Sequence, residues 1–156
     1  HSKYGGDFHM TVFTSNVDGT EHVALVMGDV MSPEPVLVRV HVLSVAEDAL
    51  GGRWSERGGE LQAAMKVVGE AGRGVIVVIR EAHSASLSEM LLSRSGDKPE
   101  GADDGNLREV GIGSQILLTL GVREMILMSN TEHAYIGLEG YGLTVVGHQA
   151  LDVDGS

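Results

Sequence analysis

Residues 60–79 read ELQAAMKVVGEAGRGVIVVI, and this stretch decides the fold class. Its first part carries apolar residues at the i, i+3, i+4 and i+7 spacing of one helix face, namely Leu61, Ala64, Met65 and Val68. Gly72 follows, as glycine does at many helix ends. Residues 74–79 then form a continuous β-branched run after the first glycine, which is typical of a strand buried on both faces. The stretch predicts a helix over residues 60 to about 71, followed by a central strand.

Toward the C-terminus, the sequence keeps alternating between helical and strand patterns. We expect a helix over residues 85–92, a charged loop over 93–105 and a second helix, capped by Asn106, over 106–120. A strand over 125–128, a short helix over 131–140 and a last strand over 143–146 should follow. This half of the chain is therefore α/β in character.

Toward the N-terminus, three strands are predicted in succession, over residues 7–13, 22–30 and 35–42, and they favour a meander or a barrel-like sheet. The fold class is thus mixed α/β (α+β), with N-terminal antiparallel strands before the alternating elements. In the third strand, alternation points the valines inward and places Arg39 and His41 as neighbours on the opposite surface. Residues 43–59 are polar and dotted with glycine, which is long for a connection inside a domain.

The composition excludes several classes of protein. The chain has 156 residues, a net charge of −11 and no cysteine, which rules out disulfides, thiol catalysis and cysteine-built zinc sites. Such an acidic chain argues against nucleic-acid binding. No apolar run approaches the roughly 18 residues that span a bilayer. We expect a single domain over residues 1–156, soluble and cytoplasmic, and the initial His1 indicates a piece excised from a longer chain.

Among polar residues, few patterns suggest chemistry. Six histidines besides His1 include no pair at i, i+4 spacing, and the glycine clusters fit helix ends better than phosphate loops. We interpret the adjacent carboxylates at 47–48 and 103–104 as solvated loop charge. Arg39-x-His41 and Asn106-x-Arg108 could together present cations near a helix N-terminus, an arrangement that suits phosphate or pyrophosphate. The alternative is that the two arginines are unrelated.

A series of motifs runs along nearly the whole chain: GDFHM, EHVALVMGDV, PVLVRVH, GGEL, GRGVIVVIR, NLREVGIGSQILLTLGVREMILMSN and GLEGYGLTVV. In this order, the motifs resemble the GTP cyclohydrolase II family of riboflavin biosynthesis. The resemblance implies the fold of that family. It also implies its reaction, in which the imidazole ring of GTP is opened with release of formate and pyrophosphate at a zinc ion.

The resemblance also implies that the family's catalytic groups have been lost here. Its three zinc cysteines align with Ser44, Ser55 and Arg57, and a hydroxyl and a guanidinium are unsuitable zinc ligands. Its Asp-x-Arg pair, a base and a phosphate-attacking arginine, is reduced to Asn106 and Arg108. Of a family segment that reads Arg-Gln-Glu-Gly-Arg, only the first arginine is kept, as Arg80. Ser129 and Ala134 occupy the positions of a family threonine and lysine, and the family's catalytic tyrosine has no counterpart.

We therefore expect no catalytic residue and no zinc, and a structural or regulatory role. The resemblance implies a homodimer and an upstream 3,4-dihydroxy-2-butanone 4-phosphate synthase domain in the same chain, where Mg²⁺ would be possible. One alternative is an enzyme that acts without metal or with Mg²⁺ held by carboxylates such as Asp48. Another is a module that binds GTP or pyrophosphate weakly, through Arg39, His41, Arg80, Arg108 and Ser129.

Overall fold

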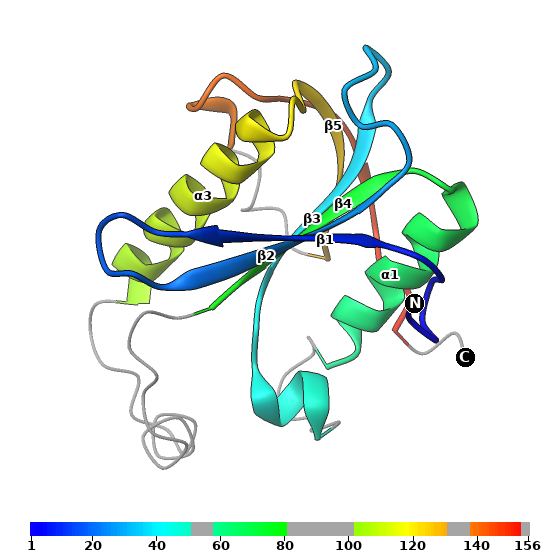
Figure 1. The fold of residues 1–156 in the computed structure, drawn as a ribbon, viewed down its shortest axis with the longest axis horizontal. Helices are drawn as coiled ribbons and strands as arrows, with labels where there is room; N and C mark the ends of the chain where they lie inside the picture. Colours follow the sequence, from blue (N-terminus) through cyan, green and yellow to red (C-terminus); the bar gives the residue numbers. More distant parts are fainter. Residues whose placement is uncertain (51–57, 81–101, 131–137, 154–156) are drawn as a thin grey trace.

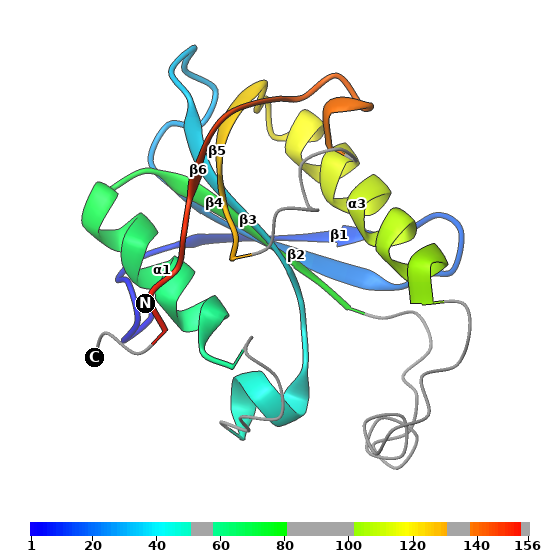
Figure 2. The ribbon, with the colours of Figure 1, turned by 180° about the vertical axis from the view of Figure 1, so that it is seen from behind.

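The computed structural model describes residues 1–50, 58–80, 102–130 and 138–153. In this part of the chain, six strands form one sheet in the order β1-β2-β4-β3-β5-β6. The strands are β1 (His9–Thr14), β2 (Glu21–Met27), β3 (Val36–Val42), β4 (Gly74–Ile79), β5 (Glu124–Met128) and β6 (Thr144–Gln149). A π-helical turn, η1 (Val45–Ala49), and two α-helices, α1 (Glu60–Ala71) and α3 (Ala102–Thr119), complete the described elements (Figures 1 and 2). The fold is mixed α/β, as the sequence predicts.

The sheet is not the predicted meander, because β4 lies between β2 and β3. The β1–β2 hairpin is antiparallel, and β2 runs antiparallel to β4. From β4 onward the neighbours β3, β5 and β6 are parallel. All six residues of β4 are buried, and a strand so apolar on both faces is stable only near the centre of a covered sheet.

Most predicted elements are present with shifted ends. The helix over 60–71 and the strand over 74–79 are confirmed, and the N–H of Gly72 closes α1 on Val68 O with φ 74°. The helix predicted to start at Asn106 begins earlier, at Ala102, so residues 103 and 104, predicted to lie in a loop, belong to its first turn. The last strand extends to Gln149. The predicted helix over 85–92, and most of the loop over 93–105 and of the helix over 131–140, lie outside the described residues.

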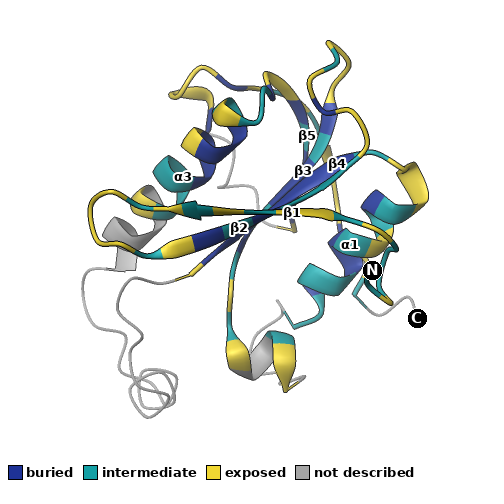
Figure 3. Cartoon of the chain, in the orientation of Figure 1, coloured by how far each residue is buried: buried dark blue, intermediate teal, exposed yellow. Residues whose placement is uncertain are grey.

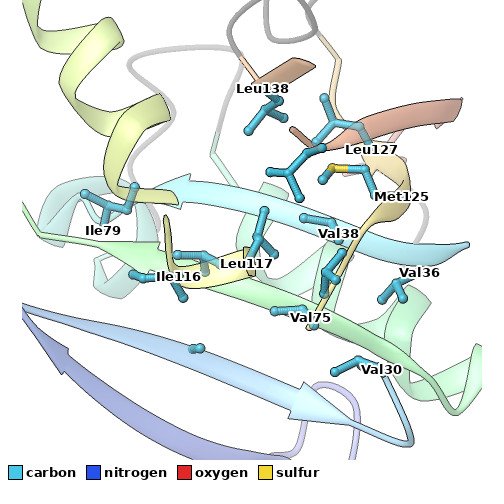
Figure 4. Close-up of a cluster of buried hydrophobic side chains, with 14 residues drawn as sticks. Val30, Val36, Val38, Val75, Ile79, Ile116, Leu117, Met125, Leu127 and Leu138 are labelled. Atoms are coloured by element: carbon cyan, nitrogen blue, oxygen red, sulfur yellow. The ribbon is translucent and has the colours of Figure 1, made fainter. Parts of the chain in front are cut away.

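Apolar residues cover both faces of the sheet. On one face, Val75 and Val77 of β4 pack with α3, in a cluster that includes Ile116 and Leu117 (Figure 4). On the other face, Ile76 of β4 packs against α1. Figure 3 shows buried residues concentrated in β3 and β4 between the two helices. We call these the α3 face and the α1 face.

Glycines allow close approach where the helices meet the rest of the chain. A Cβ at Gly113 of α3 would lie 3.1 Å from Val40 Cγ1 of β3. A Cβ at Gly69 of α1 would collide with backbone atoms of Gly5. Within the described residues, neither helix has the length and apolarity needed to cross a bilayer.

Candidate functional site

Arg39 and His41 lie side by side on β3 and face α1. The register pairs Arg39 with Ile76 and His41 with Val78, and both β4 residues belong to the α1 face. The prediction that Arg39 and His41 are neighbours is therefore confirmed, and Arg39 Nη2 is 3.4 Å from His41 Nδ1. They are buried, however, at 8% and 5% exposure, because α1 covers this face.

The guanidinium of Arg39 is held by α1 and by β5. Its Nη2 donates to Glu60 Oε2 at 2.5 Å, and its Nη1 donates to the carbonyl of Met128 at 3.2 Å. Glu60 is the first residue of α1 and is 3% exposed. A buried pair of this kind neutralises the charge of the arginine inside the protein. Arg39 is thus engaged with the protein's own carboxylate on this face.

Asp48 of η1 continues this network beyond His41. His41 Nε2 lies 2.9 Å from Asp48 Oδ2, and the Ser44 N–H donates to the same oxygen at 2.8 Å. Burial raises the pKa of Asp48, but the hydrogen bonds from His41 and Ser44 and the charge of Arg39 outweigh it and lower the pKa. The interpretation of Asp48 as solvated loop charge was wrong, since its side chain is 5% exposed. We call Glu60, Arg39, His41, Asp48 and Ser44 the buried polar network.

Arg108 lies on the other face of the sheet. It comes from α3, and its Nη2 donates to Asp18 Oδ2 in the loop between β1 and β2. The structure does not bring Arg108 together with Arg39 and His41, because α3 and α1 cover opposite faces of the sheet. Each arginine is paired with a carboxylate on its own face, Arg39 with Glu60 and Arg108 with Asp18.

The remaining predicted site residues are dispersed. Arg80 follows β4, is exposed, and donates its N–H to His22 Nδ1. Ser129 follows β5, is 4% exposed, and donates its N–H to Gln149 O at 3.1 Å. Asn106 lies inside α3, but its side chain is outside the described part, as are Ser55 and Arg57.

Two members of the network were missed from the sequence as partners. Glu60 had a local signal, since an acidic residue in the first turn of a predicted helix is stabilising there. That signal does not reveal its contact with Arg39, which depends on how α1 packs against β3. Asp48 had no comparable signal, because a carboxylate in a polar stretch is ordinarily solvated.

These features define the class of protein: a mixed α/β domain with one six-stranded mixed sheet and a buried polar network at the end of β3. The family model described as GTP cyclohydrolase II matches residues 1–150. The chain belongs to the GTP cyclohydrolase II family.

Curated relatives support this membership. The chain is 41% identical over 151 residues to the monofunctional riboflavin biosynthesis protein RIBA 2, chloroplastic, of Arabidopsis thaliana, with 94% of this chain and 31% of that protein covered. It is 40% identical over 153 residues to the probable monofunctional riboflavin biosynthesis protein RIBA 3, chloroplastic, of Oryza sativa subsp. japonica, covering 91% of this chain and 28% of that protein. It is also 41% identical over 151 residues to the riboflavin biosynthesis protein RibBA of Bacillus subtilis (strain 168), and the match covers 90% of this chain and 38% of that protein. The chain thus spans about a third of the length of these relatives.

The residues present do not fit the family's zinc. Ser44 offers a hydroxyl where the family is expected to have a thiolate, and its N–H is bonded to Asp48. The carboxylate of Asp48 is in turn engaged with His41. Among the described residues, no three His, Cys, Asp or Glu side chains are grouped so that they could hold a metal ion. Ser44 therefore supplies no zinc donor comparable to a thiolate.

Proposed function

We propose that this chain is a zinc-free GTP cyclohydrolase II-family domain without cyclohydrolase activity, with a structural or regulatory role in riboflavin biosynthesis. Family membership supports the biosynthetic context. The lost cysteine positions at Ser44, Ser55 and Arg57 support the absence of zinc. Loss of a metal that activates water removes orders of magnitude of rate.

The observation that carries this proposal is the buried polar network. It joins the end of β3 to η1 and α1 through the Ser44 N–H to Asp48, Asp48 to His41, and Arg39 to Glu60. These contacts support the packing of η1 and α1 at the end of β3. The polar groups that would serve a reaction thus serve the packing of α1 and η1 on the sheet.

The proposal includes the rest of the protein. Relatives named RibBA or bifunctional riboflavin biosynthesis protein are much longer than this chain. This supports an arrangement in which a 3,4-dihydroxy-2-butanone 4-phosphate synthase domain precedes the present domain, and Mg²⁺ would belong to that domain. We further propose a single domain over residues 1–156, a homodimer and a cytoplasmic location. Relatives named monofunctional are compatible with one activity having been lost.

The test is turnover together with metal content. The purified chain is incubated with GTP and Zn²⁺ or Mg²⁺, and formate and pyrophosphate are measured, while zinc per chain is measured by mass spectrometry. We expect neither product and far less than one zinc per chain. The triple variant Ser44→Cys, Ser55→Cys, Arg57→Cys is the matched control, and it should gain zinc because thiolates are strong zinc ligands. Stoichiometric zinc in the natural chain, or steady formate release, would overturn the proposal.

A second candidate function is binding of GTP or pyrophosphate without chemistry. Arg108 favours it, since its side chain is 39% exposed and a guanidinium has donors beyond those directed at Asp18. The burial of Arg39 and His41 and the net charge of −11 oppose it. The test is calorimetry of the natural chain and two variants with GTP, GDP and pyrophosphate. The variants are Arg108→Ala and, as a control at another exposed arginine, Arg123→Ala. Binding heat that is lost in Arg108→Ala and kept in Arg123→Ala supports this function, and the absence of heat with every ligand eliminates it.

A further inference from the structure

A cavity of about 620 Å³ lies on the α3 face, between the β1–β2 hairpin and α3. Its walls are residues 13–17 and His22 from the hairpin, the side of α3 from Arg108 to Thr119, and Tyr141. The hairpin loop runs beside α3 in both views of the fold (Figures 1 and 2). This volume is within the range of about 300–1,000 Å³ that is usual for small-molecule sites. The buried polar network is on the opposite face and takes no part in it.

His22 belongs to the wall of this cavity and carries a buried hydrogen-bond donor. It pairs directly with Phe13 across the hairpin, so both side chains are on the same face of the sheet. The residue is 1% exposed, and its Nδ1 accepts the Arg80 N–H at 3.1 Å. Burial lowers the pKa of His22, which favours the neutral ring. The proton is then on Nε2, and within the described part of the chain this buried atom has no hydrogen-bond partner. Buried donors are nearly always satisfied, so an unpaired one points to a missing acceptor.

The rest of the wall indicates what kind of molecule could bring that acceptor. Phe13, Ile112 and Ile116 give the cavity an apolar surface. Arg108 adds positive charge at its edge, where it is paired with Asp18. The carboxylate of Asp18 stays ionised, because the Thr20 N–H lowers its pKa to about 2. Because Asp18 neutralises Arg108, the edge of the cavity carries no surplus positive charge, which disfavours a polyanion.

We propose that this cavity binds a small aromatic carboxylate. Its ring packs against Phe13 and Ile112, and a carboxylate oxygen accepts the hydrogen bond from His22 Nε2. Arg108, which stays paired with Asp18, has further N–H donors at the rim for the second carboxylate oxygen. This site requires neither GTP nor a metal ion, and it goes beyond the structural or regulatory role proposed above.

The test uses benzoate as the probe and the full chain. Calorimetry gives the affinity, and nitrogen-detected NMR of the histidine rings reports which ring is affected. Acetate lacks the ring, benzyl alcohol lacks the carboxylate, and pyrophosphate is the polyanion. We expect benzoate to bind about tenfold or more tightly than each of these, with a shift at His22 Nε2. If benzoate does not bind at millimolar concentration, the proposal is overturned. A water molecule would then be the acceptor for His22 Nε2.

Three variants locate the site. His22→Asn retains an acceptor near Nδ1 for the Arg80 N–H and removes the Nε2 donor, so affinity should fall about tenfold. Gln115→Trp changes an exposed residue of the cavity wall and should block binding by bulk, without touching the core. His9→Gln, at an exposed position of β1, is the matched control and should bind benzoate as the natural chain does. Unchanged affinity in Gln115→Trp, or in a folded His22→Asn protein, refutes the site.

Discussion

At the scale of single residues, the ion pair of Arg39 and Glu60 joins the sheet to α1. Both side chains are nearly inaccessible, at 10% and 4% exposure, and the two atoms that pair are 2.5 Å apart. Desolvation makes such a pair only weakly favourable compared with apolar residues of the same shape. Its importance is that neither partner can be removed alone.

We expect Glu60→Gln to lower the free energy of unfolding by about 3–5 kcal/mol, because the guanidinium of Arg39 is left buried without its counter-ion. Urea denaturation followed by circular dichroism measures the loss. Glu70→Gln removes the same charge from an exposed position of the same helix and should change stability by less than about 0.5 kcal/mol. Equal effects of the two substitutions would mean that the pair contributes nothing specific.

Asp48 makes stability depend on pH. Its pKa in the folded protein is below the ordinary 3.8, so the unfolded chain binds its proton more readily. The stabilisation is complete above about pH 4 and is lost as the pH falls through the folded value. We expect Asp48→Asn to be less stable than the natural chain at pH 7, with the difference narrowing below pH 4. Denaturation curves across this range measure it, with the exposed Glu34→Gln as control. If the stability difference between Asp48→Asn and the natural chain did not change with pH, the lowered pKa of Asp48 would be contradicted.

At the scale of elements, local patterns predict which segments form helices and strands, but they do not predict how these segments pair. The apolar spacing around Leu61 and Val68 and the run in β4 are local, and both elements are confirmed. The insertion of β4 between β2 and β3 is a long-range choice that no local pattern contains. The same limit applies to the site. Alternation along β3 predicts that Arg39 and His41 are neighbours, whereas their burial depends on α1 and η1, which supply Glu60 and Asp48.

The packing of α1 depends on Gly69. Alanine inside a helix ordinarily stabilises it relative to glycine. Here an added Cβ would approach Gly5 Cα to 2.8 Å, so the N-terminal segment would have to move. We expect Gly69→Ala to destabilise the protein by about 1–3 kcal/mol, measured by thermal denaturation. Glu70→Ala, the next and exposed position of α1, should be neutral or slightly stabilising. If Gly69→Ala stabilised the protein, the N-terminal segment at Gly5 could move away from α1 at little cost.

At the scale of the whole molecule, the two faces of the sheet share one central strand. β4 gives Val75, Val77 and Ile79 to the α3 face and Ile76 and Val78 to the α1 face. Because side chains alternate along the strand, displacing β4 from the sheet removes residues from both cores. The two layers should therefore unfold together, as a single cooperative unit.

Leu117→Ala tests this coupling from the α3 face. Leu117 is fully buried in that core, and its truncation should cost about 2–5 kcal/mol. Native-state hydrogen exchange should then show the slowest amides of α1, on the opposite face, losing protection by the same free energy as the whole protein. Leu50→Ala, at a residue that is 74% exposed, is the control and should leave exchange nearly unchanged. If α1 kept its full protection while α3 lost it, the two faces would be separate units, and the buried polar network would have to stabilise α1 independently of the α3 core.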